Sequence, residues 1–61
     1  MRDRLKQGDR VVLISDVVKR DLYEGEEGIV ERPSYLRPGS WYVQFGDRLV
    51  RVRRYHLEKV S

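Results

Sequence analysis

Apolar residues recur in short runs along this chain, and two neighbouring runs alternate with the period of a β-strand. In residues 41–45, every second side chain is large and apolar. In residues 48–53, valines at positions 50 and 52 alternate with arginines at positions 51 and 53. The intervening Gly46-Asp47 has the length and composition of a two-residue turn. The pattern therefore predicts a β-hairpin with one apolar face and one face that carries arginines.

Three further runs predict strands at residues 10–14, 27–32 and 57–60. Pro33 ends the second of these, because proline cannot donate a hydrogen bond to a sheet ladder. The tripeptide Arg54-Tyr55-His56 is expected to form a 3₁₀ turn before the last strand. Together the runs predict an all-β fold, a small and partly open barrel of about five short antiparallel strands, since closure protects the edges of so small a sheet.

Residues 15–24 have no sustained period and are expected to form a long loop with its own apolar plugs. Two apolar pairs, Val17-Val18 and Leu22-Tyr23, lie here within a charged segment. A helix over residues 16–23 is the alternative, because Asp16 is a suitable cap and Val18 and Leu22 are four residues apart.

The segment from Gly25 to Glu31 is expected to organise the domain. Two glycines three residues apart enclose an acidic turn and lead into the apolar pair Ile29-Val30. We expect Gly28 to occupy a left-handed or crowded backbone position, so valine at this position should unfold the protein.

The length of 61 residues indicates one domain, placed at residues 8–61 after a loosely ordered lead-in over residues 1–7. With no cysteine and one histidine, His56, we expect no disulfide, metal site or cofactor. No serine lies in a nucleophile-elbow pattern, so no enzyme activity is expected. No apolar run approaches the ~20 residues of a membrane span, and the N-terminus lacks an apolar signal core. A cytoplasmic protein without membrane insertion is the expectation.

Charge is distributed unevenly along the chain, whose formal net charge is +3. Residues 1–31 contain six Lys/Arg against eight Asp/Glu, a balance of −2, whereas residues 32–61 contain seven against two, a balance of +5. We therefore look for a binding surface in the C-terminal half. The candidate partner-binding residues are Arg48, Arg51, Arg53, Arg54, Arg37, Tyr42 and Tyr35.

Within this set, Arg51 and Arg53 project from one face of a strand, about 7 Å apart, which suits adjacent carboxylates or phosphates. Arginine predominates over lysine, as is typical where planar, bidentate contacts are made. Tyr42 lies on the outer strand face and suits either stacking on a base or a protein interface, while Tyr35 and Leu36 offer apolar anchors. A solvated strand face without a partner is the alternative.

Four short motifs carry a resemblance to a known group of small barrels. They are Gly8-Asp9-Arg10-Val11, Gly25 to Val30, Tyr42 to Phe45 and Leu57 to Val60. With them the chain resembles the SH3-like barrels of electron-transport accessory proteins, a group that includes a small component of photosystem I and the variable chain of ferredoxin-thioredoxin reductase. The first loop is shorter here than in the reductase chain, so its loop contacts do not carry over. The resemblance implies an accessory protein that binds a redox or regulatory protein.

Two other groups share parts of the pattern. The Gly-x-x-Gly-x-Val bend at residues 25–30 is similar to the KOW motif of nucleic-acid-binding proteins, although Glu24, Glu26 and Glu27 replace its usual lysines. The plasmid-encoded, trimethoprim-resistant dihydrofolate reductase is also an SH3-like barrel and works as a tetramer. Its substrate-contacting Gln and Tyr are absent from residues 49–52 here.

The leading hypothesis from the sequence is a non-catalytic binding module that docks an acidic protein partner through the basic strand face. The alternative is a nucleic-acid-binding protein that places the same arginines on phosphates. An oligomeric enzyme like the folate reductase is a remote third hypothesis.

Overall fold

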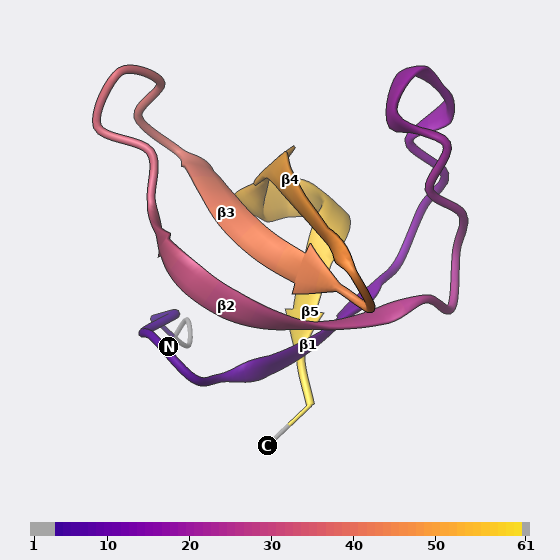
Figure 1. Ribbon diagram of the computed structural model, residues 1–61, viewed down its shortest axis with the longest axis horizontal. Helices are drawn as coiled ribbons and strands as arrows, with labels where there is room; N and C mark the ends of the chain where they lie inside the picture. Colours follow the sequence, from indigo (N-terminus) through magenta and orange to yellow (C-terminus); the bar gives the residue numbers. More distant parts are fainter. Residues whose placement is uncertain (1–3, 61) are drawn as a thin grey trace.

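Five β-strands and two 3₁₀ helices make up the computed structural model, which describes residues 4–60 (Figure 1). The elements are β1 (Arg10–Leu13), η1 (Val18–Arg20), β2 (Glu27–Pro33), β3 (Ser40–Phe45), β4 (Arg48–Arg53), η2 (Arg54–His56) and β5 (Leu57–Lys59). All neighbouring strands are antiparallel, and they form one open sheet in the order β4-β3-β2-β1-β5. The predicted all-β fold, with five short strands and a 3₁₀ turn before the last, is confirmed.

The β3–β4 hairpin has the predicted register. Phe45 pairs with Arg48 across the two-residue turn, and Trp41 pairs with Val52 near the other end. Because directly paired residues share a face, Trp41 and Val52 both face the core, and Tyr42 pairs with Arg51 on the outer face. The alternation read from the sequence thus sets which side chains are buried.

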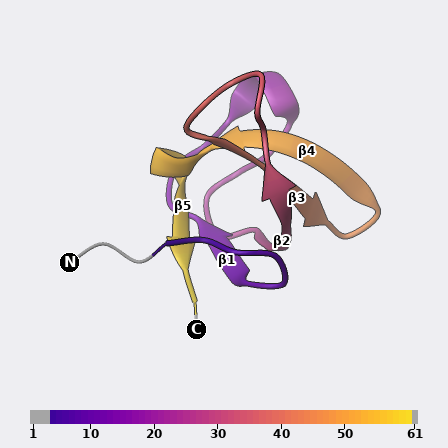
Figure 2. The same cartoon turned by 90° about the vertical axis from the view of Figure 1, so that its left-hand side faces the viewer.

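A single cluster of buried side chains lies inside the sheet. Its members are Leu5, Val11, Leu13, Leu22, Val30, Val43, Phe45, Val50, Val52 and Leu57, with Val17 and Trp41 packed against it. Since β4 and β5 are the two edge strands and both contribute to this cluster, the sheet must curl around it, as Figures 1 and 2 show. The two long loops, at residues 14–26 and 34–39, leave opposite ends of β2, and both rise to the same side of the domain in these two views.

The backbone around Gly28 is crowded, which confirms one of the two expected alternatives. A Cβ atom on Gly28 would lie 2.6 Å from Val43 Cγ1 and 2.9 Å from both Gln44 O and Phe45 Cδ1. The left-handed conformation belongs instead to Gly25, which has a φ of 95°. The bend and the close strand contact are therefore made by different glycines.

The loop between β1 and β2 contains no α-helix, so the helical alternative for residues 16–23 was wrong. Asp16 accepts a hydrogen bond from the amide of Glu24 at 2.8 Å and so ties the two ends of the loop together rather than capping a helix. Val17 and Leu22 form an isolated antiparallel bridge, and Leu22 is 0% exposed. Leu22 is thus the apolar plug that the sequence predicted.

The N-terminal segment contributes to the core through one residue. Leu5 is only 6% exposed and belongs to the buried cluster, a contact that the expected loose lead-in over residues 1–7 did not include. The amide of Lys6 donates to Asp9 Oδ2 at 2.9 Å, and the amide of Gly8 donates to Val30 O at 2.8 Å. These bonds lead the chain from Leu5 into β1.

Candidate functional site

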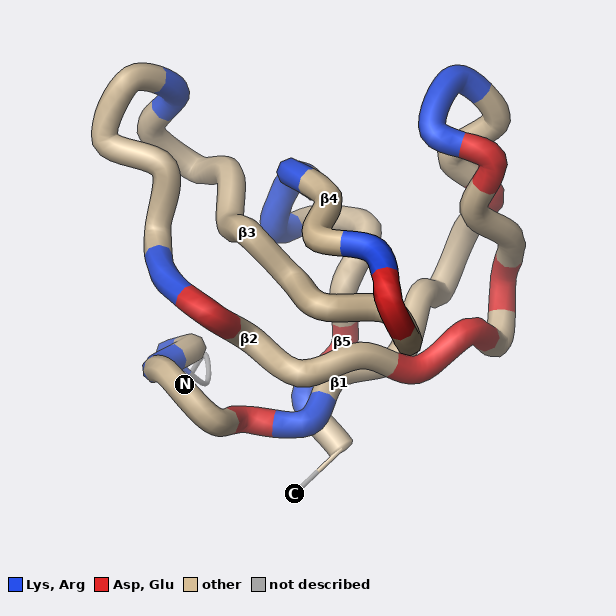
Figure 3. Tube along the Cα trace, viewed as in Figure 1, with Lys and Arg blue, Asp and Glu red and all other residues tan. Residues whose placement is uncertain are grey.

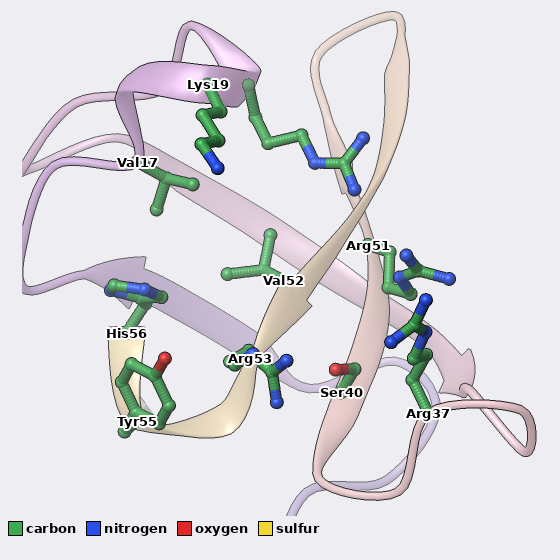
Figure 4. Close-up of a pocket in the computed structure, with 10 residues that line it drawn as sticks. Val17, Lys19, Arg37, Ser40, Arg51, Val52, Arg53, Tyr55 and His56 are labelled. Carbon is green, nitrogen blue, oxygen red and sulfur yellow. The ribbon is translucent and has the colours of Figure 1, made fainter.

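A hollow of about 260 Å³ lies beside β4, between the two long loops and η2 (Figure 4). It is lined by Val17, Lys19, Arg20, Arg37, Ser40, Arg51, Val52, Arg53, Tyr55 and His56. In Figure 4, Lys19 extends from η1 toward Val52, and Arg37 and Arg51 lie on the opposite side of β4. We refer to this place as the cationic hollow.

The cationic hollow brings together five positive side chains and no carboxylate. The five are Lys19, Arg20, Arg37, Arg51 and Arg53. Within residues 4–60, none of them forms an ion pair with an Asp or Glu. Figure 3 shows Lys and Arg on both loops and on β4, and it shows Asp and Glu on the β1–β2 loop as well, from there into β2. Because like charges repel, this arrangement favours a bound anion.

β4 places two of the five cations by simple strand alternation. Val50 and Val52 face the core, so Arg51 and Arg53 face outward one strand repeat apart. Arg51 is directly opposite Tyr42 of β3. The guanidinium groups are therefore held on a rigid element of the sheet.

The loop between β1 and β2 places Lys19 and Arg20 across from β4. The bridge from Val17 to Leu22 closes a short turn, and the amide of Val17 donates to Leu22 O at 2.8 Å. Arg48 of β4 then holds the turn from outside, with Nη1 donating to Asp21 O at 3.2 Å and Nη2 donating to Arg20 O. The turn is thus anchored both to the core through Leu22 and to the hairpin through Arg48.

The loop between β2 and β3 brings Arg37 to the same place. The amide of Ser40 donates to Arg37 O at 3.0 Å, which closes a turn through Pro38-Gly39 as the sequence predicted. The amide of Ser34 donates to Ser40 O at 2.9 Å. These bonds set Arg37 beside the first residue of β3.

The 3₁₀ helix η2 forms the remaining wall. Ser15 Oγ and His56 Nδ1 are 2.7 Å apart, and the amide of Ile14 donates to His56 O at 2.9 Å. These bonds join η2 to the start of the β1–β2 loop. The Tyr55 ring packs beside the His56 ring at 4.6 Å between centroids and is 67% exposed, so it offers a free aromatic surface at the rim.

The seven candidate residues from the sequence are divided by the structure. Arg37, Arg51 and Arg53 line the cationic hollow, whereas Arg48 and Arg54 do not. Arg48 binds the carbonyls of the β1–β2 loop, and Arg54 donates to Leu57 O at 2.5 Å, so both hold the fold together. Because Arg48 and Arg54 belong to the same basic stretch of sequence as Arg51 and Arg53, the sequence did not reveal these separate roles.

The two candidate tyrosines also lie apart from the hollow. The guanidinium carbon of Arg32 sits 4.4 Å from the centroid of the Tyr42 ring, so one face of this ring is already covered. A register shift between Val30 and Arg32 makes this contact possible, because it places Arg32 directly opposite Tyr42. Tyr35 and Leu36 lie in the β2–β3 loop and are 86% and 90% exposed.

Sequence reasoning missed Lys19, Arg20 and His56 as members of one site. Lys19 and Arg20 lie in the half of the chain with a balance of −2, so counting charge by halves assigned them to the acidic side. The adjacent Lys19-Arg20 pair, in a loop expected to carry its own apolar plugs, was the available signal.

Comparison with family models, with curated proteins and with solved structures gave no match. Among residues 4–60, no helix is long and apolar enough to cross a membrane. A functional proposal for this chain therefore depends on the residues that line the cationic hollow.

Proposed function

We propose that this protein is a non-catalytic binding module that docks an acidic segment of a protein partner in the cationic hollow. The observation that carries the proposal is the convergence of five cations from three separate parts of the chain, with no carboxylate among them. Arginine guanidinium groups bind carboxylates in bidentate geometry, and four of the five cations are arginines. A carboxylate-rich segment is the complementary ligand.

Apolar and aromatic surface in the same place supports a protein partner. The half-buried Val17 lines the hollow beside the buried Val52, and Tyr55 offers its exposed ring at the rim. Protein interfaces combine such a contact centre with a polar surround and are enriched in Tyr and Arg. The resemblance to SH3-like accessory barrels supports the same role, that of an accessory protein or regulator.

Charge reversal in β4 tests this proposal. We expect the double variant Arg51→Glu with Arg53→Glu to bind a labelled glutamate-rich peptide at least about tenfold more weakly, because two attractive contacts become repulsive. Fluorescence anisotropy measures the affinity, and circular dichroism checks that the fold is intact. Binding by the native protein should also weaken with added salt, since exposed charges are screened.

The matched control changes the same amount of charge elsewhere. Arg4 and Lys6 are exposed and do not line the hollow, and the double variant Arg4→Glu with Lys6→Glu also lowers the formal net charge from +3 to −1. We expect this control to keep most of the peptide affinity. Equal loss in both variants would show a general charge effect, and no binding by the native protein would reject the proposed function.

Single-stranded nucleic acid is the second candidate, and the exposed Tyr55 ring beside the hollow favours it. We rank it lower because Asp21 follows Arg20 and Asp47 precedes Arg48, so a polyanion that continued past the hollow would meet carboxylates. Titration with labelled single-stranded RNA at several salt concentrations tests it. A log–log slope of roughly −0.7 per neutralised phosphate, together with loss of affinity in Tyr55→Leu, would favour this candidate over the acidic protein.

A further inference from the structure

The strand β4 lies at one edge of the sheet, so one of its sides is not covered by a neighbouring strand. The two-residue turn closes on the pair Phe45 and Arg48, and bonded pairs alternate with non-bonded pairs along an antiparallel ladder. The amide of Arg54, which donates to Gly39 O at 2.8 Å, continues the series of bonded positions 48, 50 and 52. The positions between them must direct their main-chain groups to the free edge.

The free edge of β4 therefore presents the N–H and C=O groups of Leu49 and Arg51 and the N–H group of Arg53. Arg53 is also the N-cap of η2, so its C=O accepts the first hydrogen bond of that 3₁₀ helix. Apart from bonds within the strand ladders and the 3₁₀ helices, no main-chain hydrogen bond within residues 4–60 involves Leu49, Arg51 or Arg53. Unpaired strand edges of this kind accept an added strand unless the protein blocks them.

The cationic hollow crosses this free edge. Val52 faces the core and Arg51 and Arg53 face outward, yet all three line the same hollow. Val17 of the β1–β2 loop lies on the core side, which makes that side apolar next to Val52 (Figure 4). A segment lying in the hollow thus meets both faces of β4 and the main-chain groups between them.

An added antiparallel strand would meet these groups in a defined order. The residue opposite Arg51 would exchange both main-chain hydrogen bonds with it, and the residue opposite Arg53 would accept a bond from the Arg53 amide. Both residues would share the face of the arginines, so acidic side chains there would reach the two guanidinium groups. The residue between, opposite Val52, would point to the core side and contact Val17, which favours an apolar side chain.

We propose that the free edge of β4 receives an extended segment of the acidic partner as an additional strand, with the order acidic–apolar–acidic opposite Arg51, Val52 and Arg53. The inference rests on the proposed function, because it specifies how the acidic partner is bound. Opposite charges directly across a strand pair stabilise it, whereas like charges oppose it.

The same charges argue against a second copy of this chain on the edge. Antiparallel pairing of two β4 strands would bring the arginines of one copy opposite those of the other. Charged residues on an edge strand are a common protection against such self-association. The edge is therefore selective for a strand of opposite charge.

Three peptides test the inference. Each has Glu-Val-Glu at its centre between uncharged polar residues; one is unmodified, one is N-methylated at both glutamate amides, and one is N-methylated at the valine amide. A lost main-chain hydrogen bond weakens binding about fivefold, so methylation at both glutamates, which removes the bond to Arg51 C=O, should weaken it at least about fivefold. Methylation at the valine should have little effect, because that amide points away from β4.

Amide hydrogen exchange measured by NMR gives an independent readout on the full chain. We expect the amides of Arg51 and Arg53 to exchange more slowly once the unmodified peptide is bound, while the amide of Val52 is already protected in the β3–β4 ladder. A peptide with the same composition but the order Glu-Glu-Val is the matched control and should bind more weakly.

The outcomes separate the inference from the proposed function. If the peptide binds but both methylated forms bind equally and the two arginine amides stay unprotected, strand addition is overturned and docking through side chains alone remains. If no acidic peptide binds, the proposed function fails and the inference fails with it. If the two amides become protected without peptide as the protein concentration rises, a second copy occupies the edge and the proposed occupant is wrong.

Discussion

The contact between β2 and β3 at Gly28 and the cationic hollow beside β4 are built in opposite ways. At Gly28, three heavy atoms of β3 would lie within 2.6–2.9 Å of an added Cβ, so the two strands touch with no room to spare. In the hollow, side chains of like charge surround an open space of about 260 Å³. The contact at Gly28 is stabilised by close packing. In the cationic hollow, like charges repel one another, and a bound anion would relieve this repulsion.

This contrast shows where a domain of this size can accommodate a binding site. A 61-residue chain has a free energy of unfolding of only about 3–9 kcal/mol, by the usual ~0.05–0.15 kcal/mol per residue. It cannot accept a gap inside the core, and the buried cluster accordingly fills the inside of the sheet. The open space lies at the sheet edge instead, where loops and an uncovered strand meet.

The largest expected effect comes from adding a side chain at Gly28. We expect Gly28→Val to lose about 3 kcal/mol or more of unfolding free energy, because Val43, Phe45 and the carbonyl of Gln44 would all have to move. At the lower end of the reserve of about 3–9 kcal/mol this loss unfolds the domain, and at the upper end it removes about a third of the stability. Chemical denaturation followed by circular dichroism measures the change.

Gly25→Ala is the matched control for this prediction. Gly25 has a φ of 95° but no heavy atom within 4 Å of an added Cβ, so only backbone strain opposes alanine. That strain costs about 1–2 kcal/mol, and the variant should remain folded. A Gly28→Val variant as stable as Gly25→Ala would show that the β2–β3 contact is looser than described.

The packed region could be predicted from sequence to a large extent because its signals are local. The alternation in residues 41–45 and 48–53 predicted which side chains are buried, and Gly46-Asp47 predicted the turn. The register shift after Val30 was not predicted, since no sequence period marks a bulge at this place. Leu5 was also missed, because a single apolar residue in a charged segment gives no period.

The cationic hollow could be predicted only in part because its residues come from distant parts of the chain. Arg51 and Arg53 share a strand face and were found by their spacing. Lys19 joins them only because the β1–β2 loop folds back onto β4, and the bonds from Arg48 that help hold it there depend on the tertiary structure. Charge counted along the sequence cannot show which loops meet in space.

A smaller effect is expected from substituting Arg48. This substitution changes how the β1–β2 loop is held without removing a side chain that lines the hollow. Arg48 is outside the lining but binds the carbonyls of Arg20 and Asp21. In Arg48→Met, we expect the loop to be less well held, so affinity for the glutamate-rich peptide should fall about two- to fivefold, in line with lost hydrogen bonds of about 0.5–1 kcal/mol. Anisotropy titrations measure this change.

The control for Arg48→Met is Lys6→Met, which removes one positive charge from an exposed residue outside the hollow. Its peptide affinity should change less than that of Arg48→Met. Amide exchange should also be faster for residues of the β1–β2 loop in Arg48→Met alone. If both variants bind alike and the loop amides exchange at the native rate, Arg48 does not position Lys19 and Arg20.

The smallest expected effect concerns Tyr23, on the β1–β2 loop that also carries Lys19 and Arg20. The Asp21 carboxylate accepts a hydrogen bond from the Tyr23 hydroxyl and, with Asp16 and Glu26, raises the pKa of Tyr23 above its usual 10.0. The neutral phenol is thus favoured by folding, so this contribution to stability is fully present below the pKa of the unfolded chain. It is lost as the pH rises through the higher pKa of the folded state.

The β1–β2 loop carries carboxylates near Tyr23 and the cations Lys19 and Arg20 at the hollow. An ultraviolet titration of the tyrosines tests the effect of these carboxylates on Tyr23. Tyr23→Phe should remove one tyrosine ionisation, the one whose pKa lies above the usual 10.0. Asp21→Asn should shift this ionisation to lower pH, because the negative charge is lost and the hydrogen bond to a carboxylate is lost with it. Tyr35→Phe is the control, since Tyr35 lies in the other loop and is 86% exposed. A titration unchanged by Asp21→Asn would mean that Asp21 does not hold the Tyr23 proton. The separation of charge between the two regions of this loop would then be weaker than the structure indicates.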